Sequence, residues 1–558
     1  MQLKPWTASA FVLLCCTAFA EPQVVIVHAN VFTADTVHPR AEAIAIEGGR
    51  FSAVGDEAEI RTMAGPGTRV IDAGGRLVTP GLIEAHVHIG SALPSAPVPM
   101  PAMPFPGPSG EQALAAVEAA AKGPGDWVTA FIGPSVARDP RNWRTALDAV
   151  TRDRPVVLFG FWGHTTILNS AALKRLGIAE DVQDPVGGWW GRDAEGRLDG
   201  HAYETAEGIG WQRVVAQDAS MLALQFREAA QRYARWGVTS IHLMNSGKSL
   251  PLTIDTLTLA KTPQKWTIYS WARLEPRIAD AWSAMDAAPK SLPNRVRIDG
   301  PKWILDGTGI EQNALQREAY LGRPGWHGRS NYTDEQLRQI LGTALNRREQ
   351  IALHVVGDAE TDRLFKTMQS LATPETWKSK RVRVEHGDGI RNADSASEAA
   401  RFGVVVTQNP THLLPAPSTG GPPALFDRPS LLSSLLTAGV PLALGSDGGP
   451  AEANPFLNIM LATTYGALPA EALTREQALV AYTAGGAYAE RQEETKGRVK
   501  VGMAADLTVM SQDVLTVPSR MLPTTKSLLT MVDGEIVFED PDLTAGAQPP
   551  DETPADLA

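Results

Sequence analysis

A pair of histidines one residue apart closes the segment 79–88, which reads Thr-Pro-Gly-Leu-Ile-Glu-Ala-His-Val-His. Side chains two residues apart on a β-strand point to the same face of the sheet. The spacing therefore predicts that His86 and His88 project together from the end of one apolar strand toward one metal ion. Histidine pairs also occur on solvated strand faces, so this motif alone does not establish a metal site.

Four later segments repeat the pattern of a short apolar run that leads into a metal-capable side chain and then a glycine or loop. They are 301–307, 351–358, 382–387 and 441–448. Strands that alternate with helical stretches favour a parallel sheet with crossover helices. When such a sheet closes into an eight-stranded barrel, the functional groups lie at the C-terminal ends of the strands.

Eight candidate barrel strands can be placed along the chain. They fall at 78–88, 237–243, 266–273, 301–307, 350–357, 381–387, 403–408 and 441–447. Helical patterns separate most of them, for example over 221–236 and 333–348. We therefore predict an α/β fold in which a TIM-like (β/α)8 barrel spans 79–490, and 558 residues leave room for a second small domain.

Both ends of the mature chain contain short β-like runs punctuated by glycine. The N-terminal runs are 24–27, 43–46 and 51–55, and the C-terminal runs lie within 497–510 and 531–538. The economical interpretation is one composite β-sandwich built from 21–78 and 491–540. The stretch 541–558 is rich in Pro, Asp, Ala and Thr and is predicted to be a flexible tail.

The first twenty residues have the pattern of a secretory signal peptide. Lys4 supplies a positive charge, 8–16 form an apolar core, and Ala18-Phe19-Ala20 gives a small-x-small cleavage site after Ala20. This predicts a periplasmic or secreted protein; a lipoprotein modified at Cys16 is the minor alternative. The apolar core is too short to span a membrane, and no later stretch is long enough. Both cysteines lie in this segment, so metal ligands in the mature chain must be His, Asp, Glu or modified Lys.

A long excursion, 90–236, separates the first two predicted strands. It leaves from the end of the barrel where the functional groups are expected, so it either forms a lid or substrate pocket or packs on the side of the barrel. Its His164, His201 and Trp189 are candidate substrate contacts, with structural packing as the alternative. The histidines at 28, 38, 242, 327 and 412 have no comparable context, and we interpret them as structural or surface residues.

The charge balance argues against a nucleic-acid partner. The formal net charge is −11, whereas a phosphate backbone requires a basic surface. A hydrophobic content of 43% and a charged content of 20% are ordinary for a soluble globular protein. A small-molecule substrate is the expected partner, and the sequence leaves open whether the chain forms a homo-oligomer.

Taken in order, the motifs resemble those of the amidohydrolase superfamily, specifically the branch that includes N-substituted formamide deformylases. The matching elements are Pro-Gly-Leu-Ile-Glu-Ala-His-Val-His at 80–88, Lys302 with Asp306-Gly307, His354 with Gly357-Asp358-Ala359, Glu385-His386, Gly445-Ser446-Asp447 and the closing run 502–507. His164 with the run 169–173 and the run 237–240 strengthen the match to that branch. One departure lies at 308–314, where the family usually continues with an Arg-Thr-Ala run, and substrate contacts in that loop are therefore not carried over.

The resemblance implies a metal centre at the strand ends of the barrel. Its ligands would be His86, His88, Lys302, His354, His386 and Asp447. In family members the lysine can be carboxylated, and the resulting carbamate bridges two divalent ions. An unmodified Lys302 would instead be a structural ion-pair partner, and the site would hold one ion.

Neutral imidazoles and carboxylates suit Zn²⁺ or a similar divalent ion, which lowers the pKa of bound water from about 15.7 toward about 7. Our hypothesis is that the hydroxide so formed attacks an amide-like carbonyl, while Asp447 takes the water proton and passes it to the leaving nitrogen. The first expectation is thus an exported, metal-dependent amidohydrolase that cleaves a C–N bond. The alternatives are a hydrolase of an ester, lactone or cyclic imide, and a catalytically idle binding or regulatory protein on the same scaffold.

Overall fold

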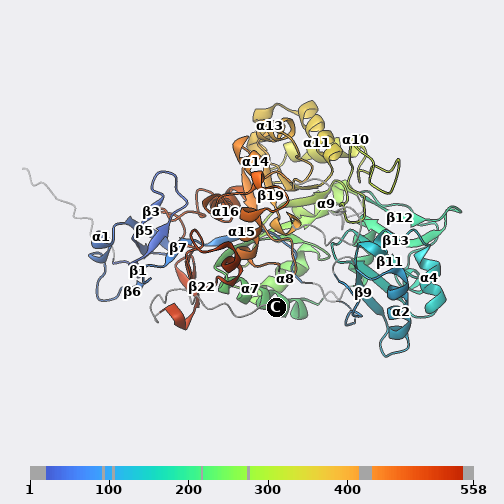
Figure 1. The fold of residues 1–558 in the computed structure, drawn as a ribbon, viewed down its shortest axis with the longest axis horizontal. Helices are drawn as coiled ribbons and strands as arrows, with labels where there is room; N and C mark the ends of the chain where they lie inside the picture. The colour runs from blue at the N-terminus through green and yellow to red at the C-terminus, as the bar shows by residue number, and fades with distance from the viewer. Residues whose placement is uncertain are drawn as a thin grey trace, which may run out of the picture.

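A computed structural model describes residues 21–90, 93, 95–103, 107–214, 218–272, 277–413, 430–450 and 452–543. The predicted signal peptide and the tail from 544 onward lie outside the described residues, as does the predicted end of the third barrel strand at Arg273. Figure 1 shows three regions side by side: a β-rich region formed by the chain ends, a central barrel, and an inserted α/β unit.

The central barrel is a sheet of eight strands in which every neighbouring pair is parallel. Its strands are β8 (Leu82–Val87), β14 (Val238–Asn245), β15 (Lys265–Trp271), β16 (Val296–Ile304), β17 (Ala352–Val355), β18 (Arg383–His386), β19 (Val405–Gln408) and β20 (Leu442–Leu444). They are ordered in space as in the sequence, and the Asp447 amide donates to the His86 carbonyl at 2.9 Å where β20 meets β8. This confirms the predicted (β/α)8 fold.

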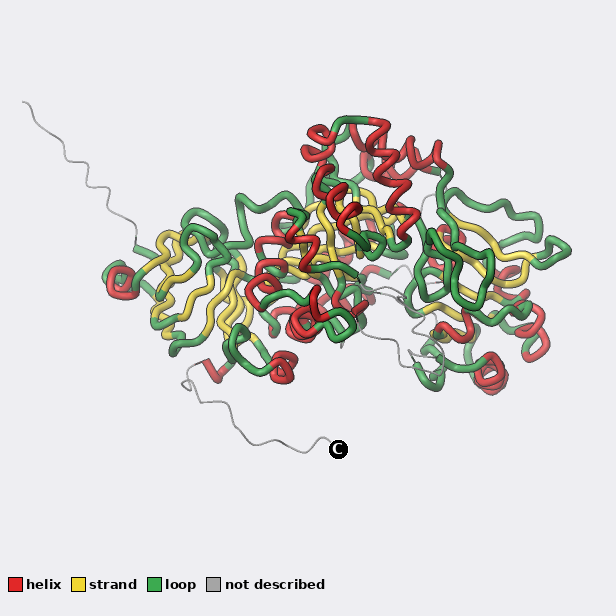
Figure 2. Tube along the Cα trace, turned by 45° about the horizontal axis from the view of Figure 1, so that its top comes forward, coloured by secondary structure: helices red, strands yellow, loops and turns green. Residues whose placement is uncertain are grey.

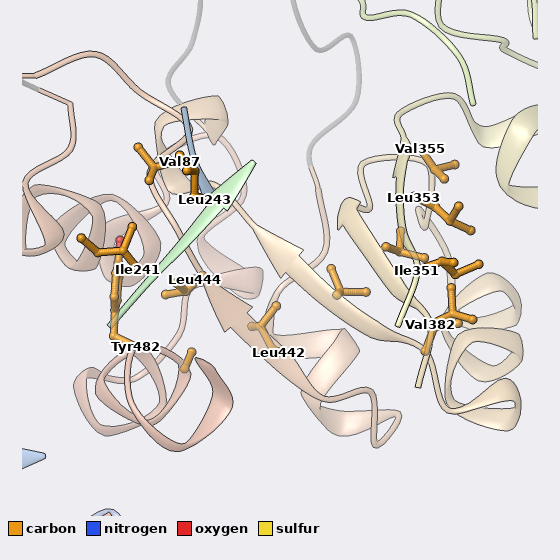
Figure 3. Close-up of a cluster of buried hydrophobic side chains, with 14 of the residues drawn as sticks. Val87, Ile241, Leu243, Ile351, Leu353, Val355, Val382, Leu442, Leu444 and Tyr482 are labelled. Atoms are coloured by element: carbon orange, nitrogen blue, oxygen red, sulfur yellow. The ribbon is translucent and has the colours of Figure 1, made fainter. Parts of the chain in front are cut away.

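Helices surround the barrel strands (Figure 2). They are α7 (Ala219–Arg235), α8 (Leu250–Ala260), α9 (Ile278–Asp286), α10 (Asp334–Leu345), α11 (Asp358–Leu371), α12 (Pro374–Lys380), α13 (Ala393–Phe402), α14 (Ser433–Thr437), α15 (Pro455–Thr464), α16 (Arg475–Ala481) and α17 (Ala484–Ala489). Aliphatic side chains such as Val87, Leu243, Leu353, Val355 and Leu444 are buried among the strands (Figure 3). Burial on both faces explains why these strands read as nearly continuous apolar runs.

The fourth barrel strand begins earlier than the sequence predicts. β16 starts at Val296 rather than at 301, because Val296, Arg297 and Ile298 pair with β15 before the apolar part of the strand begins. Arg297, Asp299 and Gly300 interrupt the apolar pattern over this part of the strand, so the sequence signal begins only at 301.

The chain ends meet in two sheets. One sheet is β5-β4-β1-β6 and the other is β23-β22-β21-β7-β2-β3. Their strands are β1 (Val24–Val27), β2 (Asn30–Phe32), β3 (Arg40–Ala41), β4 (Ala43–Glu47), β5 (Arg50–Gly55), β6 (Arg69–Asp72), β7 (Leu77–Pro80), β21 (Leu507–Met510), β22 (Ser527–Val532) and β23 (Glu535–Glu539), with α1 (Glu57–Arg61) beside them. β21 pairs antiparallel with β7, so the two ends of the chain form the predicted composite β-sandwich.

The excursion between β8 and β14 folds as a separate unit, which we call the insert. It contains the sheet β12-β13-β11-β10-β9. Its elements are β9 (Val128–Ile132), β10 (Val156–Gly160), β11 (Thr165–Leu168), β12 (Gly188–Arg192), β13 (Leu198–Glu204), α2 (Gly110–Ala121), α3 (Pro134–Ala137), α4 (Trp143–Val150), α5 (Ser170–Arg175) and α6 (Thr205–Val214). Apolar clusters of its own stabilise it, one around Phe159 and Leu173 and another around Trp143 and Leu147.

Among the residues that the structure describes, none of the helices combines the length and the apolar character needed to cross a membrane.

Candidate metal centre

The two histidines of the first barrel strand project from its carboxyl end toward the same point, as the spacing predicts. Each ring is fixed through Nδ1: His86 Nδ1 lies 2.7 Å from Glu385 Oε2, and His88 Nδ1 lies 2.7 Å from the Met244 carbonyl. Because an Nδ1–H that donates to an oxygen leaves the lone pair on Nε2, both rings present Nε2 as a ligand atom.

Asp447 adds a carboxylate oxygen close to the Nε2 atoms of His86 and His88. Its Oδ1 lies 3.3 Å from His88 Nε2 and 3.5 Å from His86 Nε2. His86, His386 and Asp447 each offer one ligand atom, and these atoms lie within 4.8 Å of one another. Both His386 and Asp447 have positive φ angles, 69° and 44°, a backbone state that is uncommon and energetically costly for residues other than glycine.

The remaining predicted ligands lie around this group. The His386 ring is 4.9 Å from His86 and 4.6 Å from His354 between centroids, and its Nδ1 lies 2.8 Å from Asn409 Oδ1. Lys302 Nζ is 3.1 Å from His86 Nε2. The structure thus brings together all six residues that the resemblance implied, from the four strands β8, β16, β17 and β18 and from the loops after β8 and β20.

Burial sets the charge state of these groups. It lowers the pKa of His86 to about 4, and it lowers the pKa values of His88, His354 and His386 as well. Although burial alone would raise the pKa of Asp447, the neighbouring His86 and His88 hold it well below its usual range. At neutral pH the centre therefore presents neutral imidazoles and one carboxylate, the donor set that suits a divalent ion.

A buried ion pair between Arg383 and Glu385 orients the His86 ring. Arg383 donates to both oxygens of Glu385 at 2.8 and 3.1 Å, and Glu385 in turn orients the His86 ring. Arg383 also donates to His242 Nδ1, the Ala85 carbonyl and Thr407 Oγ1, so its guanidinium ties four strands together inside the barrel. The sequence analysis did not single out Arg383; a charge in the middle of an apolar strand is the signal that could have revealed it.

His412 is a correction to the sequence analysis, which interpreted it as structural or surface. It lies on a short 3-10 helix, Pro410–Leu413, just after β19, and its ring stacks on His386 with centroids 5.2 Å apart. Its Nε2 is 3.6 Å from Asp447 Oδ2 and its Nδ1 is 3.9 Å from Asp388 Oδ2. Its position near the end of a barrel strand was the available signal, but β19 ends at Gln408, four residues before His412.

The insert borders the centre through one of its three candidate residues. The His164 ring lies 4.7 Å from the His354 ring, and His164 Nδ1 is 2.8 Å from Glu204 Oε1. His201 instead bonds to Asp199 and stacks on Tyr203. Trp189 stacks on Tyr203 and lies under the Arg329 guanidinium. In the described part of the chain, neither His201 nor Trp189 forms a hydrogen bond, ion pair or ring contact with a side chain of the centre.

Comparison with known proteins decides the family. The model of the amidohydrolase family matches residues 69–538, which is most of the chain. The chain belongs to the amidohydrolase family. This confirms the resemblance found in the sequence, and membership in this family supports a hydrolase.

Curated relatives of this amidohydrolase span most of its length. Protein LONG AFTER FAR-RED 3 of Arabidopsis thaliana is 27% identical over 524 residues, covering 88% of this chain and 87% of the relative. The N-substituted formamide deformylase of Arthrobacter pascens is 26% identical over 556 residues, covering 92% and 98%. A solved structure of an uncharacterized metal-dependent hydrolase from Pyrococcus horikoshii has a TM-score of 0.63 at 18% identity, covering 89% and 99%. That likeness shows a shared fold.

Proposed function

We propose that this amidohydrolase hydrolyses a C–N bond in an amide-like small molecule with the help of a bound divalent metal ion. The observation that carries the proposal is the convergence of His86, His386 and Asp447 within 4.8 Å at the carboxyl ends of the barrel strands. The N-substituted formamide deformylase among the relatives supports a C–N bond as the target.

The side chains fit a divalent ion such as Zn²⁺. Neutral imidazole nitrogens from His86, His88 and His386 and the Asp447 carboxylate face one small volume, with His354 beside it. When bound there, a divalent ion supplies Lewis-acid chemistry: it makes water more acidic and polarises a carbonyl. Two or more anchored rings with the lone pair on Nε2 are the arrangement that metal-ligating histidines show.

Lys302 decides between one ion and two. In its ammonium form, Nζ donates to the His86 Nε2 lone pair at 3.1 Å, the same lone pair that an ion would take. Carboxylation removes this positive charge and adds two oxygen ligands, so the carbamate of Lys302 fits a centre with two ions. The unmodified lysine would leave room for one.

Asp447 is the residue that moves the proton. Its low pKa keeps it ionised at neutral pH, so a carboxylate oxygen can accept a proton from the attacking water and deliver it to the leaving nitrogen. Oδ2 is the oxygen nearest to His412, and Oδ1 is held between His86 and His88.

Two other activities remain open to the same centre. Ester, lactone or cyclic imide hydrolysis would use the same residues, and a catalytically idle binding protein would retain the scaffold without turnover. We further propose, from the signal-peptide pattern of 1–20, that the mature enzyme works in the periplasm or outside the cell.

The test is elemental analysis of the mature protein together with a panel of N-formyl and N-acyl amines, esters and lactones, assayed before and after chelation. Hydrolysis of an amide that chelation abolishes and added metal restores is the expected result. Two divalent ions per chain that fall to one in Lys302→Ala would support the bridging carbamate. A well-folded protein with no bound metal and no turnover would overturn the proposal in favour of a binding protein.

A further inference from the structure

Lys248 is a buried cation that the proposed reaction does not use. It lies between β14 and α8 and is 2% exposed. Its Nζ donates to three main-chain carbonyls, those of Ile89 at 2.9 Å, Gly90 at 2.8 Å and Ser246 at 2.8 Å. An ammonium group has three N–H donors, so each donor of Lys248 has an acceptor. We call these three carbonyls the carbonyl cage.

The carbonyl cage contains no acidic side chain, which is unusual around a buried lysine. In the part of the chain that the structure describes, no carboxylate forms an ion pair with Lys248, and burial lowers its pKa to about 7. Burying a charge is costly unless the charge is paired. A neutral aliphatic side chain would avoid this cost, so the three hydrogen bonds of the ammonium group call for a role of their own.

The carbonyl cage joins two loops at the carboxyl end of the barrel. β8 and β14 are neighbouring parallel strands. Ile89 and Gly90 belong to the loop after β8, whereas Ser246 and Lys248 belong to the loop after β14. Lys248 therefore cross-links the two loops by hydrogen bonds.

Each of the two loops is also fixed to a helix. Gly90 has a φ of 82°, and a Cβ there would lie 2.8 Å from the Phe226 ring of α7. Asn245 donates from Nδ2 to the Lys248 carbonyl at 2.9 Å and accepts from the Thr253 hydroxyl of α8 at 2.7 Å. The helices thus hold each loop separately, and Lys248 holds the loops to each other.

The metal ligand His88 depends on both loops. It directly precedes Ile89, and its Nδ1 lies 2.7 Å from the carbonyl of Met244 near the end of β14. Its side chain is 30% exposed, whereas the His86 side chain is fully buried, so packing restrains His88 less. A shift of one loop against the other would stretch the His88–Met244 hydrogen bond and move Nε2 from its place 3.3 Å from Asp447 Oδ1.

We propose that Lys248 is a positioning residue for His88: its ammonium group holds the loops after β8 and β14 together and thereby raises the affinity of the centre for its divalent ion. The inference rests on the proposed function, in which His88 binds that ion. Nζ bonds to main-chain carbonyls, so Lys248 acts through His88 and not on the substrate.

The first experiment compares Lys248→Met with Lys265→Met. Methionine retains most of the volume of the lysine side chain but donates no hydrogen bond. Lys265 is the matched control, because it begins β15 at the opposite end of the barrel and pairs with Asp506 and Asp533. We expect the dissociation constant for Zn²⁺ to rise about 10- to 100-fold in Lys248→Met and to keep the wild-type value in Lys265→Met.

Competition with a chromophoric chelator measures the dissociation constant, and circular dichroism of the metal-free proteins checks the fold. The visible spectrum of the Co²⁺-loaded protein should change in Lys248→Met and not in Lys265→Met. Both substitutions remove a partly or fully buried lysine, so a purely structural role would not separate the two variants.

The charge of Lys248 is tested separately in Lys248→Ala. Propylammonium has the same heavy atoms as the part of the side chain that this substitution removes. In the buffer it should restore most of the affinity for Zn²⁺, whereas propanol, which lacks the charge and two of the donors, should not. Equal recovery with propanol would assign Lys248 to packing and overturn the inference.

A third measurement uses the wild-type protein and needs no variant. Buried lysines react with an acylating reagent through local opening, and a ligand that requires the closed form slows this opening. Zn²⁺ should slow acetylation of Lys248 by N-hydroxysuccinimidyl acetate at least about tenfold more than acetylation of Lys496. Lys496 is also buried, but it donates to Ser240 in the first half of β14. Peptide mass spectrometry follows both sites in one sample.

Two further results would overturn the inference. Lys248→Met could fold and bind Zn²⁺ with wild-type affinity, or Zn²⁺ could slow acetylation of Lys248 and Lys496 equally. In either case chelator-sensitive amide hydrolysis by the wild type would leave the proposed function standing. A wild-type protein that binds no divalent ion would remove the proposed function together with this inference. If Lys248→Met does not fold, the acetylation measurement decides.

Discussion

At the scale of single residues, Asp447 is surrounded by the imidazoles of four histidines. Its two carboxylate oxygens face imidazoles of His86, His88, His386 and His412 at 3.3 to 3.8 Å. Its main chain is in the left-handed region, and its amide donates to the His86 carbonyl. The main chain at Asp447 is therefore held by its own hydrogen bond. A substitution that removes only the carboxylate should change the chemistry without changing the fold.

Replacing Asp447 with Asn should abolish turnover and leave the fold intact. The amide keeps the size of the side chain but cannot accept and release a proton, so we expect kcat to fall roughly 100- to 10,000-fold. Steady-state kinetics and circular dichroism on the same preparation test this. A variant that retains wild-type kcat would remove Asp447 from its role as proton carrier.

Arg383 is expected to matter for stability more than any surface ion pair. It is fully buried and supplies both hydrogen bonds that hold Glu385 under His86. Arg383→Met leaves the Glu385 charge buried without its partner, so we expect a loss of about 3–5 kcal/mol. Chemical denaturation followed by tryptophan fluorescence measures it.

The double variant Arg383→Met with Glu385→Gln is the matched control. Removing both charges together should recover part of the lost stability, since no unpaired charge remains. If the double variant is no more stable than Arg383→Met alone, the destabilisation comes from lost packing and not from the unpaired carboxylate.

At the scale of elements, the close approach of β16 to the segment that leads into β17 depends on a glycine at position 300. A Cβ on Gly300 of β16 would lie 1.9 Å from the carbonyl oxygen of Gln350, the backbone that leads into β17. A backbone carbonyl cannot rotate away as a side chain can. The approach of these two segments therefore requires a residue without a side chain at 300.

Gly300→Ala should destabilise the barrel by about 1–3 kcal/mol or more, because β16 and the segment before β17 must separate. Gly342→Ala is the control, since a Cβ at Gly342 on α10 meets nothing within 4 Å. In that helix alanine should stabilise by about 0.5–1 kcal/mol. Thermal melting of both variants tests the pair; equal effects at the two sites would contradict the contact at Gly300.

The start of a helix is one feature that the local sequence can determine. α10 begins with a capping box in which Thr333 accepts from the Gln336 amide and Gln336 accepts from the Thr333 amide. The predicted helix at 333–348 had the right start because this signal is local. The predicted barrel strands were also placed correctly in number and order, and only their ends differ.

At the scale of the whole molecule, a polar chain runs through the barrel interior away from the centre. Arg383 donates to His242 Nδ1, and His242 Nε2 lies 3.1 Å from Glu490 Oε1. Glu490 also pairs with Lys496 at 2.7 Å, and Lys496 donates to Ser240. This chain ties the barrel strands to the segment that leads into the C-terminal half of the β-sandwich.

We expect stability to fall as the pH is lowered below neutral. Burial lowers the pKa of His242, and Lys496 with His242 holds the pKa of Glu490 well below its usual range despite burial. A lowered native pKa means that the unfolded chain binds the proton first, so stability is complete above the unfolded pKa. It is lost below about pH 6.5 for His242 and below about pH 4.5 for Glu490.

Melting temperatures between pH 3 and pH 8 measure this dependence in the wild type and in Glu490→Gln. The variant should be less stable at neutral pH and should show a shallower decline below about pH 4.5, because the Glu490 carboxylate has been removed. A wild-type profile that rises as the pH falls toward 4 would contradict the sign of the effect.

The sequence by itself determined the fold class, and its family resemblance named the candidate ligand residues at the strand ends. Short apolar runs, glycine breaks and helical stretches are local signals, and a strand end in a (β/α)8 barrel has a fixed orientation. The resemblance to the amidohydrolase superfamily then implied His86, His88, Lys302, His354, His386 and Asp447 as candidate ligands before any coordinates. The composite β-sandwich followed in the same way from β-like runs at both chain ends.

Only the tertiary structure decided which distant residues share a site. His412 joins Asp447, Arg383 supports His86 through Glu385, and Glu311 meets His164 and Glu204 at the junction between insert and barrel. Loops and inserts carry these contacts, and the direction in which a loop returns depends on the packing of the whole chain. Periodic patterns in a sequence predict helices and strands. Contacts between two distant loops leave no periodic pattern, so they could not be predicted in this way.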